Sequence, residues 1–144
     1  MKKMYYLVAL VSVSVFLISC DDDDAPYYDV RDEYAGRYGV DDYCDIGVSD
    51  YVLDIYKSDY DDEIVFGFPG LFESGMDVYA IVTGMKIIIP IQQFHVSTFP
   101  DIFYEFSGSG SLEDSVLTVE YQVLTVQNGL ITDDVDCSAK MIRE

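Results

Sequence analysis

The clearest pattern in the chain is Val116-Leu117-Thr118-Val119-Glu120-Tyr121-Gln122-Val123, in which apolar and polar side chains largely alternate. Successive side chains of a β-strand point to opposite faces of a sheet, so a period of two predicts a half-buried strand. Leu117, Val119, Tyr121 and Val123 share one parity, which we expect to face the core. The stretch therefore predicts an all-β fold.

Further segments on either side of this stretch have the composition of short strands. They are rich in Val, Ile, Tyr and Phe, which pleated surfaces favour, and none has the 3.6-residue period of a long amphipathic helix. The expected strands cover residues 34–40, 51–56, 63–68, 77–82, 86–90, 102–106 and 135–142. Pro90 is expected to end or bulge its strand, and Asn128-Gly129 to form a hairpin turn.

The spacing of these strands predicts their arrangement. Turns every eight to twelve residues or so, without a crossover helix, favour an antiparallel up-and-down meander of about eight strands. Such a meander closes into a lipocalin-like barrel or folds as a two-sheet β-sandwich. We favour the barrel, because closure removes the exposed strand edges that promote unwanted pairing.

The N-terminus has the features of an export signal. Two lysines precede an uncharged run over residues 5–19, which is shorter than the ~20 residues that a membrane-spanning helix needs. Leu17-Ile18-Ser19-Cys20 resembles a lipobox, the motif at which a signal peptide is removed and the new N-terminal cysteine is lipidated. We therefore expect a lipoprotein signal peptide over residues 1–19 and a lipid on Cys20. The alternative is an ordinary signal peptide with an incidental cysteine.

An acidic segment follows the lipobox. Asp21-Asp22-Asp23-Asp24 cannot be buried, so we expect residues 20–33 to hold the lipidated cysteine and a solvated leash. An acidic run behind the cysteine resembles the surface-export signal of Bacteroidota-type lipoproteins. In enterobacterial systems an aspartate at this place resembles an inner-membrane retention signal instead. The first resemblance implies an outer-membrane lipoprotein that faces the cell surface; the periplasmic face is the alternative.

The charge of the chain restricts its partners. Loss of the signal peptide removes two lysines and leaves six basic against 27 acidic residues, a formal charge of −21. Such a protein repels nucleic acid, whose binding depends on Lys and Arg. It also repels an anionic membrane surface, so we expect the lipid anchor to provide membrane attachment. Cationic partners, including basic peptides, remain compatible with this charge.

The order of several short motifs resembles the small lipocalin-like lipoproteins of Bacteroidota. These motifs are Gly36-Arg37-Tyr38, a cysteine at Cys44, residues 87–92 (IIIPIQ), Gly108-Ser109-Gly110 before the strand that contains Tyr121, and Cys137-Ser138-Ala139-Lys140. The resemblance implies a barrel domain over residues 34–144 and a place in the cell envelope. It implies no catalytic residue, because members of this group mostly lack an assigned activity.

Two cysteines remain after lipidation. In an exported protein, a pair of thiols usually forms a disulfide, so we expect Cys44 and Cys137 to be joined. The bond would connect the first strand to the last. The alternative is two separate buried thiols.

The remaining reactive residues do not form a recognisable catalytic or metal site. His95 is the only histidine and is expected on the surface of a loop, without the further ligands that zinc needs. Gly108-Ser109-Gly110 lacks the pattern of a nucleophile elbow. The acid pairs Asp61-Asp62 and Asp133-Asp134 are expected to be solvated. We therefore expect no catalytic residue, metal or cofactor, and a protein that is not an enzyme.

Aromatic residues near the expected strand ends can form a contact surface for a partner or cover the ends of the barrel. They are Tyr27-Tyr28, Tyr43, Tyr60, Phe94 and Phe99, and the apolar pair Leu71-Phe72 lies in an expected loop. We expect a binding or accessory lipoprotein whose ligand, apolar or a peptide, occupies the barrel mouth or these loops. The alternatives are an interaction subunit of a surface complex for nutrient uptake, or a protein inhibitor. A hollow barrel would favour a small ligand, and a filled barrel with an exposed apolar patch would favour a protein partner.

Overall fold

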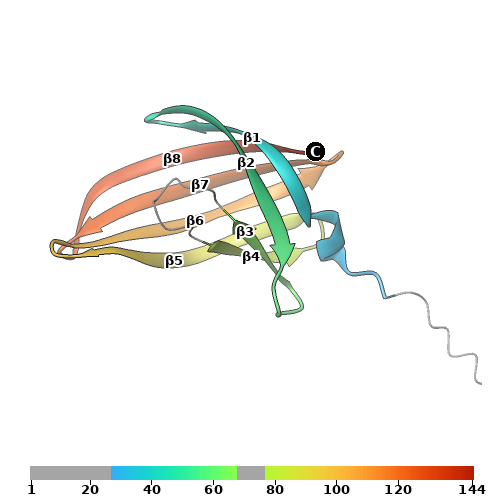
Figure 1. Ribbon diagram of the computed structural model, residues 1–144, viewed down its shortest axis with the longest axis horizontal. Coiled ribbons are helices and arrows are strands. Elements are labelled where there is room, and N and C mark those ends of the chain that lie inside the picture. Colours follow the sequence, from blue (N-terminus) through green and yellow to red (C-terminus); the bar gives the residue numbers. More distant parts are fainter. Residues whose placement is uncertain (1–26, 68–76) are drawn as a thin grey trace, which may run out of the picture.

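The computed structural model describes residues 27–67 and 77–144 (Figure 1). The expected signal peptide, Cys20, the run of four aspartates and the Leu71-Phe72 pair lie outside these residues. No helix within the described part is long and apolar enough to span a membrane. A short 3-10 turn, η1 (Val30–Glu33), precedes eight described strands that form a closed barrel.

The strands follow one another around the barrel in chain order, and neighbours are antiparallel. They are β1 (Gly36–Cys44), β2 (Gly47–Lys57), β3 (Glu63–Gly67), β4 (Asp77–Thr83), β5 (Lys86–Thr98), β6 (Asp101–Glu113), β7 (Val116–Gln127) and β8 (Leu130–Arg143). This confirms the all-β meander and the barrel, and it excludes the two-sheet sandwich. Asn128 and Gly129 form the expected turn, with φ angles of 50° and 79°.

The barrel closes where β1 pairs with β8, from Tyr38 opposite Arg143 to Cys44 opposite Cys137. The expected parity of β7 is also observed. Leu117, Val119 and Tyr121 are buried and Val123 is half-buried. In β8 the buried residues are Val135, Cys137, Ala139 and Met141. One face of each strand therefore supplies the interior of the barrel.

β6 lies unusually close to β7 at two glycines. A methyl group added to Gly108 would lie 2.5 Å from the carbonyl oxygen of Glu120 and 2.8 Å from Cβ of Tyr121. At Gly110 it would lie 2.7 Å from the carbonyl oxygen of Thr118. Real Cβ atoms do not approach other atoms so closely, and native interiors leave few voids. The Gly108-Ser109-Gly110 motif is thus part of β6, where glycine allows β7 to pack close.

One end of the barrel, which we call the proximal end, is covered by η1. Arg31 is 9 % exposed, and its guanidinium donates to the carbonyl oxygens of Ser58, at 3.2 Å, and Tyr60 in the β2–β3 turn. The hydroxyl of Tyr34, which directly follows η1, donates to the carbonyl oxygen of Gly84 in the β4–β5 turn at 3.0 Å. Residues 30–33, expected in the leash, are therefore folded against the barrel.

Two further contacts hold η1 in place. Asp29 accepts hydrogen bonds from the Arg31 guanidinium, with the shortest at 2.8 Å, and this interaction holds the pKa of the Asp29 carboxyl well below its usual range. Arg143, near the end of β8, donates to the carbonyl oxygens of Asp32 and Glu33 at 3.1 and 2.9 Å. The first and last described segments thus meet at the proximal end.

β5 contains the irregularity expected at Pro90. Its register against β6 shifts between Ile89 and Gln92, but the strand continues to Thr98 instead of ending. The Gln92 side chain replaces the missing backbone pairing with β4, because its amide donates to the carbonyl oxygen of Tyr79 at 2.8 Å and its oxygen accepts from the Tyr79 N–H at 3.0 Å. β4 and β5 therefore lose their backbone pairing at the bulge but stay linked through the Gln92 side chain.

Beyond this bulge, four strands extend away from the proximal end. The extended part, which we call the wing, comprises residues 92–106 of β5 and β6 and residues 121–136 of β7 and β8. β3 and β4 are shorter than these strands, and Figure 1 shows β5–β8 reaching past the rest of the barrel on the left. Residues 122–127 of β7 are half-buried on both faces, which is expected for a sheet that has left the closed barrel.

Candidate functional site at the distal end

The distal end, opposite η1, contains a buried polar cluster at the base of the wing and an exposed apolar tip. Asp42 lies in β1 and is 1 % exposed. Its Oδ2 accepts hydrogen bonds from the hydroxyl of Tyr51 at 3.0 Å and from the hydroxyl of Tyr121 at 2.5 Å. Hydrogen bonds to a charged group in a poorly solvated site are strong, and they offset the cost of burying the carboxylate.

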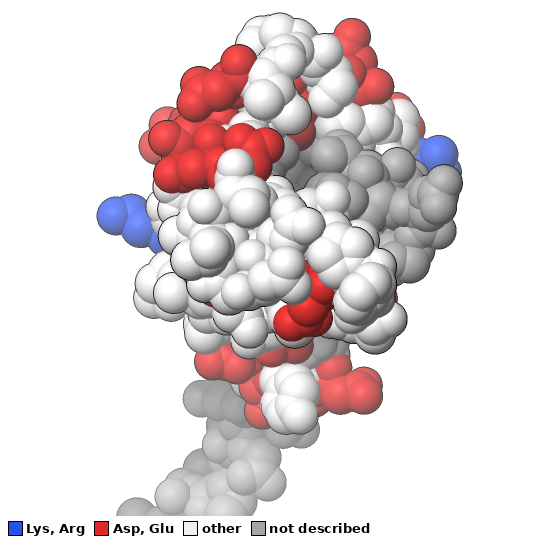
Figure 2. All heavy atoms as spheres, turned by 90° about the vertical axis from the view of Figure 1, so that its left-hand side faces the viewer, with Lys and Arg blue, Asp and Glu red and all other residues white. Residues whose placement is uncertain are grey.

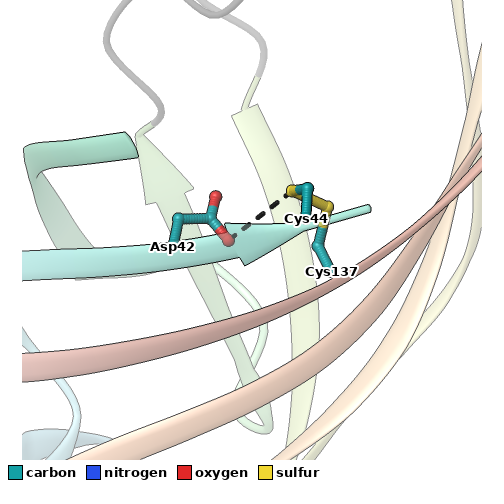
Figure 3. Close-up of side chains that lie close together, drawn as sticks. All are labelled: Asp42, Cys44 and Cys137. Carbon is teal, nitrogen blue, oxygen red and sulfur yellow. Dashed lines mark hydrogen bonds between the residues drawn. A yellow bond between two sulfur atoms is a disulfide. The ribbon is translucent and has the colours of Figure 1, made fainter. Parts of the chain in front are cut away.

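The expected disulfide between Cys44 and Cys137 is present directly beside this cluster (Figure 3). The Cα atoms are 4.0 Å apart, and the residues are separated by 93 positions in the sequence. Asp42 Oδ1 lies 3.9 Å from Cys44 Sγ, but a disulfide sulfur carries no hydrogen to donate. The three residues also do not form a metal site in this state, because a metal requires the free thiolates.

The two tyrosines of the cluster remain protonated over a wide pH range. Burial raises the pKa of the Tyr51 and Tyr121 hydroxyls, and the hydrogen bond to Asp42 raises both further. Both phenols therefore continue to donate to Asp42 at neutral pH. The geometry suits a structural anchor between β1, β2 and β7 better than a proton-transfer group.

Aromatic rings connect this cluster to the wing. Phe106 stacks on Tyr121 with ring centroids 6.0 Å apart, and Phe94 meets Phe106 edge-on at 5.9 Å. Phe94 is half-buried against the core, so the expectation that it belongs to an exposed loop surface is wrong. The reason is the bulge at Pro90, which lets β5 continue and turns Phe94 inward.

The tip of the wing is apolar and exposed. Phe99 is 96 % exposed, Leu130 71 % and Ile131 64 %. The two hairpin turns of the tip are joined, because the N–H of Asn128 donates to the carbonyl oxygen of Asp101 at 2.8 Å. Phe99 is among the exposed residues expected from the sequence, whereas Leu130 and Ile131 are not. Two adjacent apolar residues directly after an Asn-Gly turn could have indicated them, since one of the pair must face solvent.

His95 lies in β5, so its expected position in a loop is wrong. Its Nε2 is 3.2 Å from Oδ1 of Asp101, and its ring packs on Phe103 with centroids 4.9 Å apart. It is exposed at the outside of the wing. Among the described residues, His95 is not part of any group of three or more His, Cys, Asp or Glu side chains whose ligand atoms lie together.

The other candidate residues are divided between the two ends. Asp61-Asp62 and Tyr60 lie in the exposed β2–β3 turn, and Tyr27-Tyr28 precede η1, all at the proximal end. Asp133-Asp134 are exposed on β8 in the wing. The aromatic residues therefore do not form the single contact surface considered from the sequence.

Charge is distributed unequally along the barrel. Lys and Arg residues of the described part lie in η1 or in the proximal portions of the strands; they are Arg31, Arg37, Lys57, Lys86, Lys140 and Arg143. The wing contains five Asp and Glu residues and no Lys or Arg. Figure 2, which looks onto the distal end, shows acidic side chains gathered along one side, with Lys and Arg only at the margins.

Comparisons with known proteins support the fold alone. No protein-family model matches the chain, and no curated protein sequence matches it. A solved structure of a redesigned β-barrel, b11L5F_LGL, is similar to 82 % of this chain and 97 % of its own length. The TM-score is 0.53 and the identity is 10 %. This similarity agrees with the closed barrel and indicates no function, since fold does not determine function.

The Asp42 cluster gives a testable prediction about stability. Tyr121→Phe removes the shorter hydrogen bond to a buried carboxylate, so we expect a loss of about 1–3 kcal/mol in the free energy of unfolding, measured by urea denaturation. Tyr43→Phe is the matched control, because Tyr43 lies beside Asp42 on β1 but is 54 % exposed. Equal stability of the Tyr121→Phe variant and the wild type would show that the cluster does not support the barrel.

Proposed function

We propose that this protein is a lipid-anchored, non-enzymatic module of the cell envelope that binds a protein partner through the tip of its wing. The observation that carries the proposal is the joined pair of hairpin turns bearing Phe99, Leu130 and Ile131 in exposed positions. Large exposed apolar side chains gathered at one end of a folded domain are typical of interaction sites. A role as an accessory subunit of a surface complex, such as one for nutrient uptake, agrees with this arrangement.

The direction of the anchor supports the same proposal. The first described residue, Tyr27, lies at the proximal end, seven positions after the lipobox cysteine, Cys20. Seven residues span at most about 25 Å when fully extended. A lipid on Cys20 would therefore hold the end covered by η1 towards the membrane and direct the wing away from it. We place the anchor in the outer membrane, with the protein facing the cell surface; the periplasmic face is the alternative.

The packing of the interior favours a protein partner over a small apolar ligand. Neither Gly108 nor Gly110 leaves room for a methyl group on the inside of β6. The rings of Phe94, Phe106 and Tyr121 pack against one another where the core meets the wing. An apolar guest inside this part of the barrel would have to displace these side chains, whereas the wing tip is accessible without rearrangement.

The anchor can be tested by replacing the lipidated residue. Cys20→Ala removes the thiol that carries the diacylglyceryl group, so we expect the protein to move from the membrane fraction to the soluble fraction after export. Cys44→Ala with Cys137→Ala is the control, because it removes cysteines without affecting the anchor. Membrane association of the Cys20→Ala protein equal to that of the wild type would contradict lipidation at this residue.

The binding surface can be tested by photo-cross-linking in the organism that produces the protein. A photoreactive phenylalanine analogue at Phe99 is expected to give a discrete cross-linked product of higher mass on illumination. The same analogue at Tyr60 is the control, because Tyr60 is 70 % exposed at the proximal end. The proposal fails if position 99 gives no product, or if both positions give the same one.

A further inference from the structure

We propose that the partner of the wing is a basic polypeptide surface, in which Lys or Arg side chains flank apolar ones. This inference deepens the proposed function and rests on it. It names the chemistry of the partner from the charge of the wing.

The acidic groups of the wing surround the apolar tip. Asp101 adjoins the turn that contains Phe99, and Asp133 and Asp134 follow Leu130 and Ile131 on β8. Glu105 and Asp136 lie farther from the tip. A partner that buries the three apolar side chains thus brings its own surrounding residues close to carboxylates.

Within the wing these carboxylates lack Lys or Arg partners. Asp134 accepts a hydrogen bond from the neutral amide of Gln122 at 2.9 Å. Oδ1 of Asp101 lies 3.2 Å from Nε2 of His95. The Lys and Arg ion pairs found among the described residues are all at the proximal end, where they join Arg31 and Lys57 to Asp29, Lys57 to Asp32, and Arg37 to Glu144. The negative potential of the wing is therefore available to an external cation.

A polypeptide fits these features better than a membrane does. Apolar side chains at a hairpin tip can also insert into lipid, but bacterial and most other biological surfaces are anionic and would repel a wing with five acids and no Lys or Arg. A metal ion alone does not account for the tip either. Among the described residues, the wing has no group of three His, Cys, Asp or Glu side chains close enough to hold one.

The test uses the lipidated full-length protein in phosphatidylcholine vesicles and a fluorescent synthetic peptide of alternating Lys and Leu. We expect the peptide to bind to these vesicles above the background of protein-free vesicles, and binding to weaken as salt concentration rises. A peptide of alternating Glu and Leu is expected not to bind. An oligolysine of equal charge is expected to bind more weakly, because it lacks the apolar contact with the tip.

Two charge variants make the test specific for the wing. Replacement of Asp133, Asp134 and Asp136 by Asn is expected to weaken binding about tenfold, since exposed ion pairs each contribute a fraction of a kcal/mol to about one. Replacement of Asp59, Asp61 and Asp62 by Asn changes the net charge equally but lies in the β2–β3 turn, and it is expected to leave affinity unchanged. Phe99→Ser with Leu130→Ser is expected to weaken binding as well.

Four results would overturn the inference. Equal weakening by both charge variants would assign binding to total net charge, and equal binding of the Glu-Leu peptide would remove the role of charge. Cross-bridging of protein-bearing vesicles to protein-free phosphatidylglycerol vesicles would identify a membrane as the target. If position 99 still cross-links to a partner while the Lys-Leu peptide fails to bind, the proposed function stands and the basic partner is rejected.

Discussion

The pairing of β1 with β8 is the constraint on which the rest of the structure depends. Without it, the eight strands would form an open sheet with two free edges, and the buried faces of β1 and β8 would lose their opposite walls. The Cys44–Cys137 disulfide secures the distal end of this seam. A crosslink that closes a loop of 93 positions stabilises the folded chain by about 4–5 kcal/mol in loop-entropy models.

The seam also explains the position of the polar cluster. Asp42 lies two residues before Cys44 on β1, and its partners Tyr51 and Tyr121 come from β2 and β7. The carboxylate therefore connects strands on both sides of the seam, since β7 is the neighbour of β8. Loss of the seam would separate Asp42 from Tyr121 and leave a buried charge with fewer donors, which adds to the cooperativity of the barrel.

Much of the fold follows from elementary patterning. The alternation in Val116–Val123 fixes which face of β7 is buried, and the Asn-Gly turn fixes the hairpin with β8. The strands expected from the sequence are shorter than the observed ones, because the wing residues lie on a sheet with two half-exposed faces. Such residues, for example Leu124 and Val126, do not alternate in polarity, so periodicity is not informative there.

The candidate site was less predictable. The two cysteines and Phe99 could be selected from residue type and context, whereas Asp42 could not be distinguished from 26 other acidic residues. Its burial depends on pairings with Tyr51 and Tyr121, which lie nine and 79 positions away. Long-range register of this kind is set by barrel closure and leaves no local signal in the sequence.

The most direct test of barrel closure is hydrogen–deuterium exchange of the oxidised protein, followed by mass spectrometry of its peptides. We predict that peptides from residues 38–44 of β1 and residues 137–143 of β8 exchange as slowly as those from the proximal halves of β6 and β7, because these segments are all paired on both edges. Rapid exchange over residues 38–44 and 137–143, with the proximal halves of β6 and β7 protected, would show that the seam is an open edge and would contradict the closed barrel.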